Sequence, residues 1–187
     1  MKIYQKLRVL FYKLLSIKIT HIGKNYQPLL AEGLGTIHIG KSSIGNKKSP
    51  FYFSGYTYLE ARSPHSTIEI GDHTQINNNA VIIAEKTSVK IGNHVLIGTE
   101  FCVYDSDFHE LNPNKRLSNE HLCMPVIIKD NVFIGSRVTI LKGVTIHENS
   151  VIGSGSVVTK NIPANEIWAG VPAKKVGNLN SATKPAP

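Results

Sequence analysis

The residues best suited to acid–base chemistry gather in one polar stretch, residues 104–125, with the sequence YDSDFHELNPNKRLSNEHLCMP. His109 lies near its start, and histidine changes its protonation state near neutral pH, so it can accept or donate a proton. Three carboxylates flank it, on Asp105, Asp107 and Glu110. Either one of them pairs with the imidazole and fixes its tautomer, or all three only solvate the segment. The sequence does not choose between these two readings.

The elements around this stretch follow a period of six residues, which is clearest in residues 126–158, VIIKDNVFIGSRVTILKGVTIHENSVIGSGSVV. One residue of each six is a large aliphatic one: Ile128, Ile134, Ile140, Ile146, Ile152 and Val158. Two places earlier stands a small or β-branched residue: Val126, Val132, Val138, Val144, Ser150 and Ser156. Two columns in one register indicate a genuine repeat.

A period of six fits neither an amphipathic helix nor a hairpin sheet. It fits an all-β solenoid in which each six forms a flat face and a turn, because positions two apart in a strand share a face. Both columns then point into one interior. The phrases IEIGDH (68–73), VKIGNH (89–94) and VIIKDN (126–131) are expected to head successive coils and to stack.

The chain divides into three parts. Residues 1–24 are expected to hold a basic amphipathic helix, and residues 163–187 a capping segment and mobile tail. Between them, residues 25–162 form the solenoid, with two interruptions. An aromatic-rich insertion is predicted at 46–66, which we interpret as satellite core rather than a sugar-stacking surface. The second interruption is 104–125, an excursion loop too long for a coil corner, and such loops are usually functional or disordered.

The N-terminal helix allows two interpretations. Its apolar residues recur at helical spacing among lysines and arginine, and no acidic residue precedes Glu32. It either packs on its own body or a neighbouring subunit, or lies on a membrane surface near a lipid-linked substrate.

Composition narrows the function classes. The formal net charge of +8 favours anionic partners. Nucleic acid is not expected, because no binding motif accompanies the charge. Cys102 and Cys123 form no CxxC pair and are expected as reduced thiols in a cytoplasmic protein, at the inner face of the membrane if the helix meets lipid. No segment has the ~18 apolar residues of a spanning helix, and no usual signal peptide is recognised.

The loop string DSDFHELNPNKR, followed by VFIGSRVTILKGVTI, VIGSGSVVTKNIP and AGVPAK, resembles the maltose, galactoside and polysaccharide O-acetyltransferases over about residues 68–177. The resemblance implies a left-handed parallel β-helix with three sixes per coil. It also implies a homotrimer with active sites between subunits, acetyl-CoA as co-substrate, no required metal, and a saccharide hydroxyl as acceptor. Surface polysaccharide, O-antigen or capsule sugar is the expected acceptor class.

The resemblance also implies roles for individual residues. His109 takes the place of the catalytic base. Asn77, with Asn79 as the fallback, takes that of an asparagine that orients the imidazole or substrate, although such asparagines also form corner ladders. The backbone N–H of Ser136, directly after Gly135, is the expected oxyanion donor.

Further residues are matched to cofactor and acceptor. For acetyl-CoA these are Gly135, Ser136, Ser154, Gly155, Thr159, Lys160, Gly170, Pro172 and Lys174. Lysines pair readily with phosphates, but each one could equally be ordinary solvated charge. Asn79, Asp107 and Arg116 are assigned to the acceptor.

Three rivals remain. Zinc-dependent γ-class carbonic anhydrases share this coil, but position 114 is Asn where a third histidine ligand is expected, and His73 and His94 at equivalent repeat positions indicate corner stacking. A non-catalytic scaffold would be expected to lack the loop histidine. N-acyltransferases acting on amino or nucleotide sugars often add an N-terminal Gly-rich Rossmann module, which is not seen here.

Overall fold

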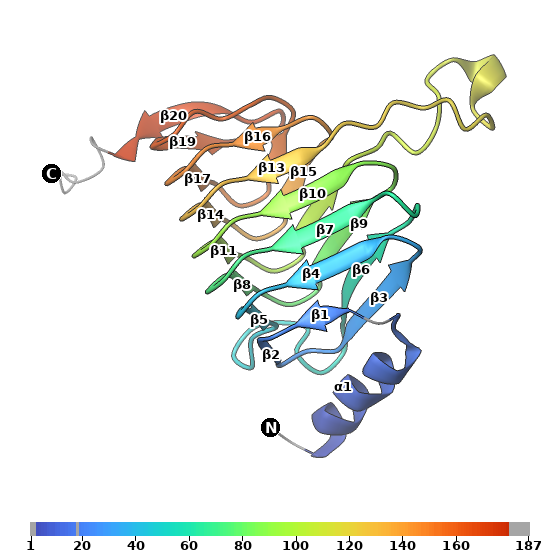
Figure 1. Cartoon of the computed structure of the whole chain (residues 1–187). Coiled ribbons are helices and arrows are strands. Elements are labelled where there is room, and N and C mark those ends of the chain that lie inside the picture. Colours follow the sequence, from blue (N-terminus) through green and yellow to red (C-terminus); the bar gives the residue numbers. More distant parts are fainter. Residues whose placement is uncertain (1–2, 18, 180–187) are drawn as a thin grey trace, which may run out of the picture.

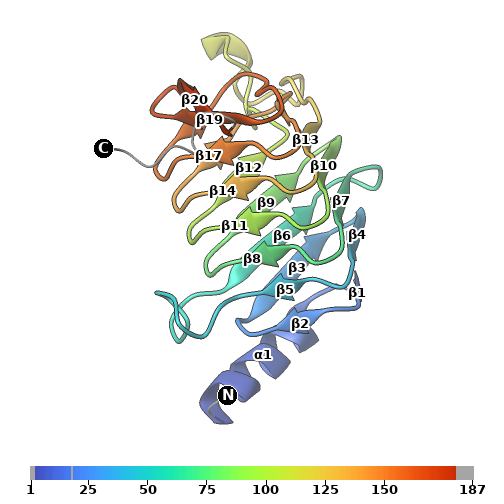
Figure 2. The same cartoon turned by 90° about the vertical axis from the view of Figure 1, so that its left-hand side faces the viewer.

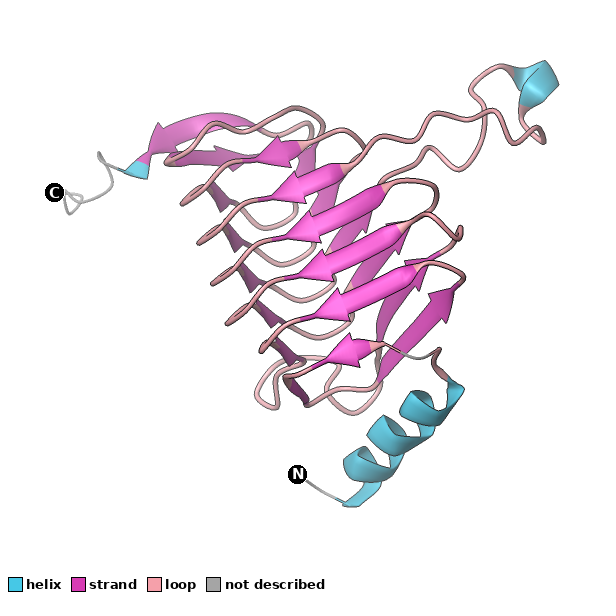
Figure 3. Ribbon diagram, viewed as in Figure 1, coloured by secondary structure: helices cyan, strands magenta, loops and turns pink. Residues whose placement is uncertain are grey.

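A computed structural model describes residues 3–17 and 19–179 and shows a three-sided prism of short strands (Figures 1 and 3). Sheet A contains β1 (Thr20–His21), β4 (Thr36–Ile39), β7 (Thr67–Ile70), β10 (Ser88–Ile91), β13 (Val126–Ile128) and β16 (Thr145–Ile146). Sheet B contains β2 (Lys24–Asn25), β5 (Ser43–Ile44), β8 (Gln75–Ile76), β11 (Leu96–Ile97), β14 (Phe133–Ile134), β17 (Val151–Ile152), β19 (Glu166–Ala169) and β20 (Lys174–Asn178). Sheet C contains β3 (Leu29–Gly33), β6 (Thr57–Ala61), β9 (Val81–Ala84), β12 (Cys102–Tyr104), β15 (Thr139–Ile140) and β18 (Val157–Val158).

The chain passes from sheet A to B to C and back to A, so the prism has an A–B edge, a B–C edge and a C–A edge. Strands of successive coils pair in parallel, and among the strands of the described residues only β19 and β20 pair antiparallel. The predicted all-β, left-handed β-helix is confirmed. The stacking of the three phrases is confirmed too, because Val89 pairs with Ile68 on one side and with Val126 on the other.

Both predicted columns line the interior. The large column is fully buried from Ile128 to Val158, and the small column includes the buried hydroxyls of Ser150 and Ser156. Each of these hydroxyls donates to backbone carbonyls nearby, for Ser150 to those of His147 and Pro163 at 2.8 Å. A buried hydroxyl that is hydrogen-bonded in this way costs little, so serine can replace valine in the column.

The edges are built from stacked turns. At the B–C edge, a Cβ on Gly135 would lie 2.6 Å from the backbone nitrogen of Ser154, so only glycine allows the two coils to approach this closely. At the A–B edge, the rings of His73 and His94 stack with centroids 5.0 Å apart, as expected for corner histidines. An asparagine ladder runs along the same edge: Asn131, Asn149 and Asn165.

Two boundaries differ from the expected ones. The helix α1 (Ile3–Leu15) ends early, and β1 and β2 already form coil within residues 1–24. Only residues 46–56 of the expected insertion leave the coil, because β6 pairs with β3 and β9 along its length. At the C-terminus, β19 and β20 close sheet B, whereas the expected tail from residue 180 onward lies outside the described residues.

The insertion supports α1 through polar contacts. The buried Gln5 amide donates to the Tyr52 carbonyl at 2.6 Å, and the Arg8 guanidinium donates to the carbonyls of Phe53 and Gly55 at 2.7 and 2.8 Å. Tyr52 is buried, as expected for satellite core, while Phe53 remains half-exposed. The helix is therefore held by these polar bonds together with the contact between the rings of Tyr12 and Tyr56, whose centroids are 5.1 Å apart.

Candidate active site at the excursion loop

The excursion loop leaves the C–A edge between β12 and β13 as two antiparallel limbs. Ser106 pairs with Cys123, and the Met124 N–H donates to the Asp105 carbonyl at 2.8 Å. Beyond these limbs the loop extends away from the prism and turns through the 3₁₀ helix η1 (Pro113–Lys115) (Figure 1). The regular wall thus fixes the base of the loop and leaves its tip in solvent.

Asp105 anchors the loop to the coil below. Its fully buried carboxylate accepts hydrogen bonds from the backbone N–H groups of Glu85, Lys86 and Thr87, at 2.7, 3.2 and 2.7 Å, and from the Thr87 hydroxyl at 2.8 Å. These donors satisfy the charge without a cation. Asp105 therefore has a structural role and does not pair with the imidazole.

The backbone turns at Phe108, directly before His109. The Phe108 backbone has a φ of 61°, in the left-handed region that bulky residues rarely adopt. The Ser106 hydroxyl accepts from the Phe108 N–H at 2.8 Å, and the ring packs edge-on against Tyr104 with the Arg62 guanidinium 5.2 Å from its centroid. Such backbone outliers persist where surrounding contacts enforce them and often occur at functional sites.

His109 is exposed, and its Nδ1 lies 3.0 Å from the Arg116 carbonyl oxygen. A carbonyl can only accept, so Nδ1 carries the proton and, in the neutral ring, Nε2 holds the lone pair. The backbone of Arg116, rather than any neighbouring carboxylate, thus fixes the tautomer. The sequence gives no sign of this contact, because any residue at position 116 supplies a carbonyl.

The other two carboxylates near His109 also have bonding partners other than the imidazole. Asp107 accepts from the Lys142 ammonium at 2.7 Å, and the Glu110 side chain accepts from the Leu111 N–H at 2.9 Å. The sequence allowed either pairing with the imidazole or simple solvation of the loop. Neither describes these two carboxylates fully, because each stabilises the loop through a specific bond. Lys142 was missed in the sequence because it belongs to the next coil.

The predicted oxyanion donor lies on a different edge. Ser136 follows β14 at the B–C edge, where its N–H donates to the Ser154 hydroxyl at 3.2 Å and its own hydroxyl accepts from the Thr99 N–H at 3.2 Å. Ser154 and Gly155 are exposed beside it, and Gly155 has a φ of 73° with open space where a Cβ would be. Small residues therefore keep this edge open, as acetyl-CoA binding would require.

The asparagine run also lies on the B–C edge and supports the insertion. The Asn77 amide donates to the Ser49 hydroxyl at 3.0 Å, while the buried Asn78 amide donates to the carbonyls of Asn46 and Pro50 at 2.9 and 2.7 Å. Asn79 has a φ of 63°, and its N–H donates to Gln27 Oε1 at 2.9 Å. Asn78, which the sequence analysis assigned no role, is the structural centre of the run.

The remaining residues that the sequence predicts to bind the cofactor are divided between the two edges. Gly170 and Pro172 lie between β19 and β20, after the coil that carries Ser154, and Lys174 begins β20 with an exposed side chain. Thr159 and Lys160 are exposed on the C–A edge, one coil beyond Lys142.

Within one chain, the structure does not bring all these residues together. His109, Asp107, Arg116, Thr159 and Lys160 belong to the C–A edge, and the asparagines, glycines and serines belong to the B–C edge (Figure 2). Sheet C separates the two edges. A hollow of about 830 Å³ on the outer face of sheet A is lined by none of the predicted site residues, so it does not unite them.

The positions of the histidines do not support the alternative of a zinc-dependent carbonic anhydrase. His73 and His94 belong to the A–B edge, where their rings stack on each other, and His109 belongs to the loop at another edge. Asn114 lies in η1 at the exposed loop tip.

The chain is similar to known proteins in both sequence and fold. Residues 125–160 match the model of the bacterial transferase hexapeptide, six repeats. The galactoside O-acetyltransferase of Escherichia coli is 41% identical over 119 residues, which are 64% of this chain and 58% of that protein. A putative lipopolysaccharide biosynthesis O-acetyl transferase of the same organism is 33% identical over 125 residues, 63% of each chain.

Among solved structures, a hexapeptide-repeat acetyltransferase of Vibrio cholerae complexed with acetyl coenzyme A superposes with a TM-score of 0.60. The sequence identity is 27%, and the match covers 96% of this chain and 80% of that one. The chain spans less than two thirds of the length of the curated relatives it matches. The hexapeptide repeat thus matches over residues 125–160, and the chain is similar to hexapeptide acetyltransferases in sequence over part of its length and in fold over most of it.

Proposed function

We propose that the protein is an acetyl-CoA-dependent O-acetyltransferase that acts on a saccharide hydroxyl, with His109 as general base. One observation carries the proposal: His109 Nδ1 donates to the Arg116 carbonyl, so Nε2 of this exposed side chain holds the lone pair in the neutral ring. The acetyltransferase names of the related proteins, one of them bound to acetyl coenzyme A, support the same reaction.

The reaction needs no covalent enzyme intermediate. Nε2 of His109 takes the proton of the acceptor hydroxyl while the hydroxyl oxygen attacks the thioester carbonyl of acetyl-CoA. The tetrahedral intermediate then expels the CoA thiolate, and the imidazolium returns the proton to that sulfur. The products are the acetyl ester and CoA, and no step passes through a metal.

The oxyanion of this intermediate is stabilised by the Ser136 N–H in our proposal. That N–H donates to the Ser154 hydroxyl, a neutral acceptor on an exposed side chain that can rotate away. A developing oxyanion is a stronger acceptor in the same place. Asn77 and Asn79 on this edge, with Asp107 and Arg116 on the loop, are the proposed contacts to the acceptor.

The active sites lie between subunits of a homotrimer. The reason is that the B–C edge of one prism must face the excursion loop on the C–A edge of the next to bring Ser136 near His109. The loop itself fits a partner surface, because Leu111 and Leu117 near its tip are 77% and 96% exposed. Exposed apolar side chains on an extended loop are typical of contact sites.

The acceptor is proposed to lie near a membrane, because α1 presents an unpartnered apolar face. Gln5 and Arg8 face the insertion, whereas the opposite side exposes Ile3, Leu7, Leu10, Phe11 and Leu14. Lys6 and Lys13 flank that face and suit anionic headgroups. Among the described residues no helix is long and apolar enough to cross a bilayer. Contact in the plane of the membrane would place the enzyme beside a lipid-linked surface polysaccharide precursor.

The membrane contact is tested by sedimentation with vesicles. We expect the protein to sediment with vesicles rich in phosphatidylserine, and the Leu10→Glu variant to remain in solution. Equal binding of wild type and variant would contradict the proposal. Leu34→Glu is the matched control, since Leu34 is also an exposed leucine but belongs to the coil and not to α1.

The activity is tested by thiol release from acetyl-CoA with free sugars, nucleotide sugars and polysaccharide repeat units as acceptors. We expect acceptor-dependent release with a hydroxyl acceptor and an ester product. An amide product on an amino sugar would instead favour the N-acyltransferase alternative. Full activity of the His109→Ala variant would contradict the assigned base.

A further inference from the structure

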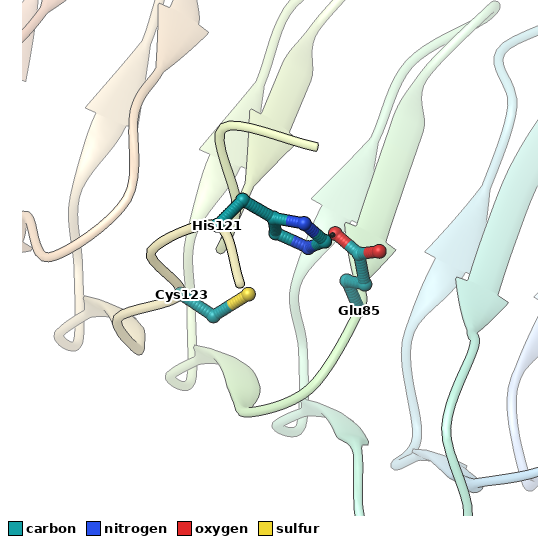
Figure 4. Close-up of side chains that lie close together, drawn as sticks. All are labelled: Glu85, His121 and Cys123. Carbon is teal, nitrogen blue, oxygen red and sulfur yellow. Dashed lines mark ion pairs between the residues drawn. The ribbon is translucent and has the colours of Figure 1, made fainter. Parts of the chain in front are cut away.

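We propose that Glu85, His121 and Cys123 bind a divalent transition-metal ion, Zn²⁺ foremost, at the base of the excursion loop (Figure 4). These side chains take no part in the proposed acetyl transfer. The site would be structural, because it joins the loop to the wall of the prism.

The three ligand atoms already converge. A carboxylate oxygen, an imidazole nitrogen and the thiol sulfur lie within 4.8 Å of one another, and Nε2 of His121 is 2.9 Å from Oε2 of Glu85. An ion at tetrahedral distances of about 2.0–2.3 Å from each ligand requires such mutual spacings. Thiolate and imidazole together favour Zn²⁺ over Mg²⁺ or Ca²⁺, which prefer oxygen ligands.

The imidazole of His121 is buried beside the Glu85 carboxylate, and among the described residues it has no hydrogen-bond partner. The residue is 7% exposed and Glu85 is 8% exposed, so both side chains are screened from water. Both ring nitrogens of His121 are buried without a hydrogen-bond partner, since the short contact to Glu85 does not have hydrogen-bond geometry. A buried polar group left in this state is destabilising. A metal ion on one nitrogen would remove part of that cost.

The backbone presents the ligands from two sides. His121 and Cys123 are two residues apart in the extended return limb of the loop, so their side chains share a face. Glu85 comes from the corner that follows β9, one coil earlier, and Figure 4 shows its carboxylate directed at the imidazole. An ion held by all three would cross-link the return limb to the prism.

Neighbouring groups orient the carboxylate, as is usual around metal ligands. The Ser106 hydroxyl donates to Oε2 of Glu85, and the Arg62 guanidinium lies 3.4 Å from Oε1. One carboxylate and one thiolate balance the charge of a dication, which limits repulsion between the ion and Arg62. A water molecule would complete four-coordination.

An ion held at this place would act on the loop through its base. For the proposed enzyme, the ion would steady the loop that carries His109. That consequence rests on the proposed function, whereas the metal site itself does not.

The experiment is a titration of chelator-treated protein with Co²⁺ and then Zn²⁺, followed by absorption spectroscopy. We expect one Co²⁺ per chain, a near-ultraviolet thiolate-to-cobalt charge-transfer band, and loss of the band when Zn²⁺ displaces Co²⁺. The Cys123→Ala variant should lose the band and bind Zn²⁺ at least about 100-fold more weakly. The Cys102→Ala variant, which removes the other free thiol, should behave as wild type.

His121→Ala and the exposed His65→Ala form a second matched pair, with weakened binding expected only for His121→Ala. Circular dichroism confirms that each variant keeps its sheet content. The proposal is overturned if wild type shows no stoichiometric Co²⁺ band, or if Cys123→Ala binds Zn²⁺ as tightly as wild type. Because the titration contains no acetyl-CoA, its result is independent of whether the acetyltransferase assay succeeds.

Discussion

The prism wall and the excursion loop are stabilised in opposite ways. In the wall, successive coils bury mostly aliphatic columns, and interior side chains such as Ile134 and Ile140 have no exposed surface. In the loop, the residues from His109 to Glu120 are exposed or partly exposed, and order depends on polar bonds such as that of His109 to the Arg116 carbonyl. The comparison shows a regular, apolar wall and an exposed, polar loop, and in our proposal the wall supplies rigidity while the loop supplies the catalytic base.

The two regions meet at a few polar anchors. Asp105 ties the loop to the corner at residues 85–87, and the Asp107–Lys142 ion pair ties it to the coil above. Variants in the loop should therefore change activity with little effect on stability, whereas variants in the wall should do the reverse. Variants at the anchors should affect stability more than variants in the loop do, and less than variants in the wall do.

The largest effect is expected for His109→Ala. Removing a positioned base should lower acetyl transfer by about 10²–10⁴-fold. The free energy of unfolding should not change, because the side chain is exposed. Steady-state kinetics and urea unfolding on the same preparation check both points. A large loss of stability would show that His109 belongs structurally to the wall, and His65→Ala is the control.

In the wall, Ile140→Ala should lower the free energy of unfolding by about 2–5 kcal/mol, since it opens a cavity in a fully buried column. Leu141→Ala is the matched control, because its side chain is partly exposed at the next position and should cost far less. Equal effects in urea denaturation would contradict the assignment of the inward column.

At the anchor, Asp105→Asn should cost about 1–3 kcal/mol, because an amide cannot accept all the bonds that the buried carboxylate accepts from residues 85–87. Limited proteolysis should then cut the loop faster than in wild type, while the wall stays intact. An unchanged cleavage rate would mean that other contacts hold the loop.

Lys142→Ala should have the smallest effect. The ion pair with Asp107 is only partly buried, and such pairs contribute about 0–1 kcal/mol. Thermal unfolding should shift little, and a destabilisation as large as that of Ile140→Ala would contradict the proposed division of roles.

The wall could be predicted from the sequence because its signal is repeated. One inward column from Ile128 to Val158 fixes the period, the inward face and the register between coils, and the structure confirms all three. The start of the coil was missed at Thr20, where β1 and β2 are two residues long and carry no hexapeptide pattern. Strand β6 was missed because it carries Thr57 and Ala61 in place of isoleucine.

The candidate site could be predicted only in part. His109 was recognisable by its place in the loop, but its partner is a backbone carbonyl, which leaves no trace in residue types. Asp105 and Asp107 looked equivalent in sequence, yet one is buried against three N–H groups and the other pairs with a lysine of the next coil. Long-range contacts of this kind depend on the path of the loop, which no local pattern specifies.

The most direct test of the shared site mixes two inactive variants. His109→Ala removes the base from one edge, and Ser154→Trp fills the exposed position beside Ser136 on the other edge. If each site takes His109 from one subunit and the B–C edge from the next, random co-assembly of equal amounts should restore about one site in four. Mixed trimers with no more acetyl transfer than either variant alone would contradict a site shared between subunits.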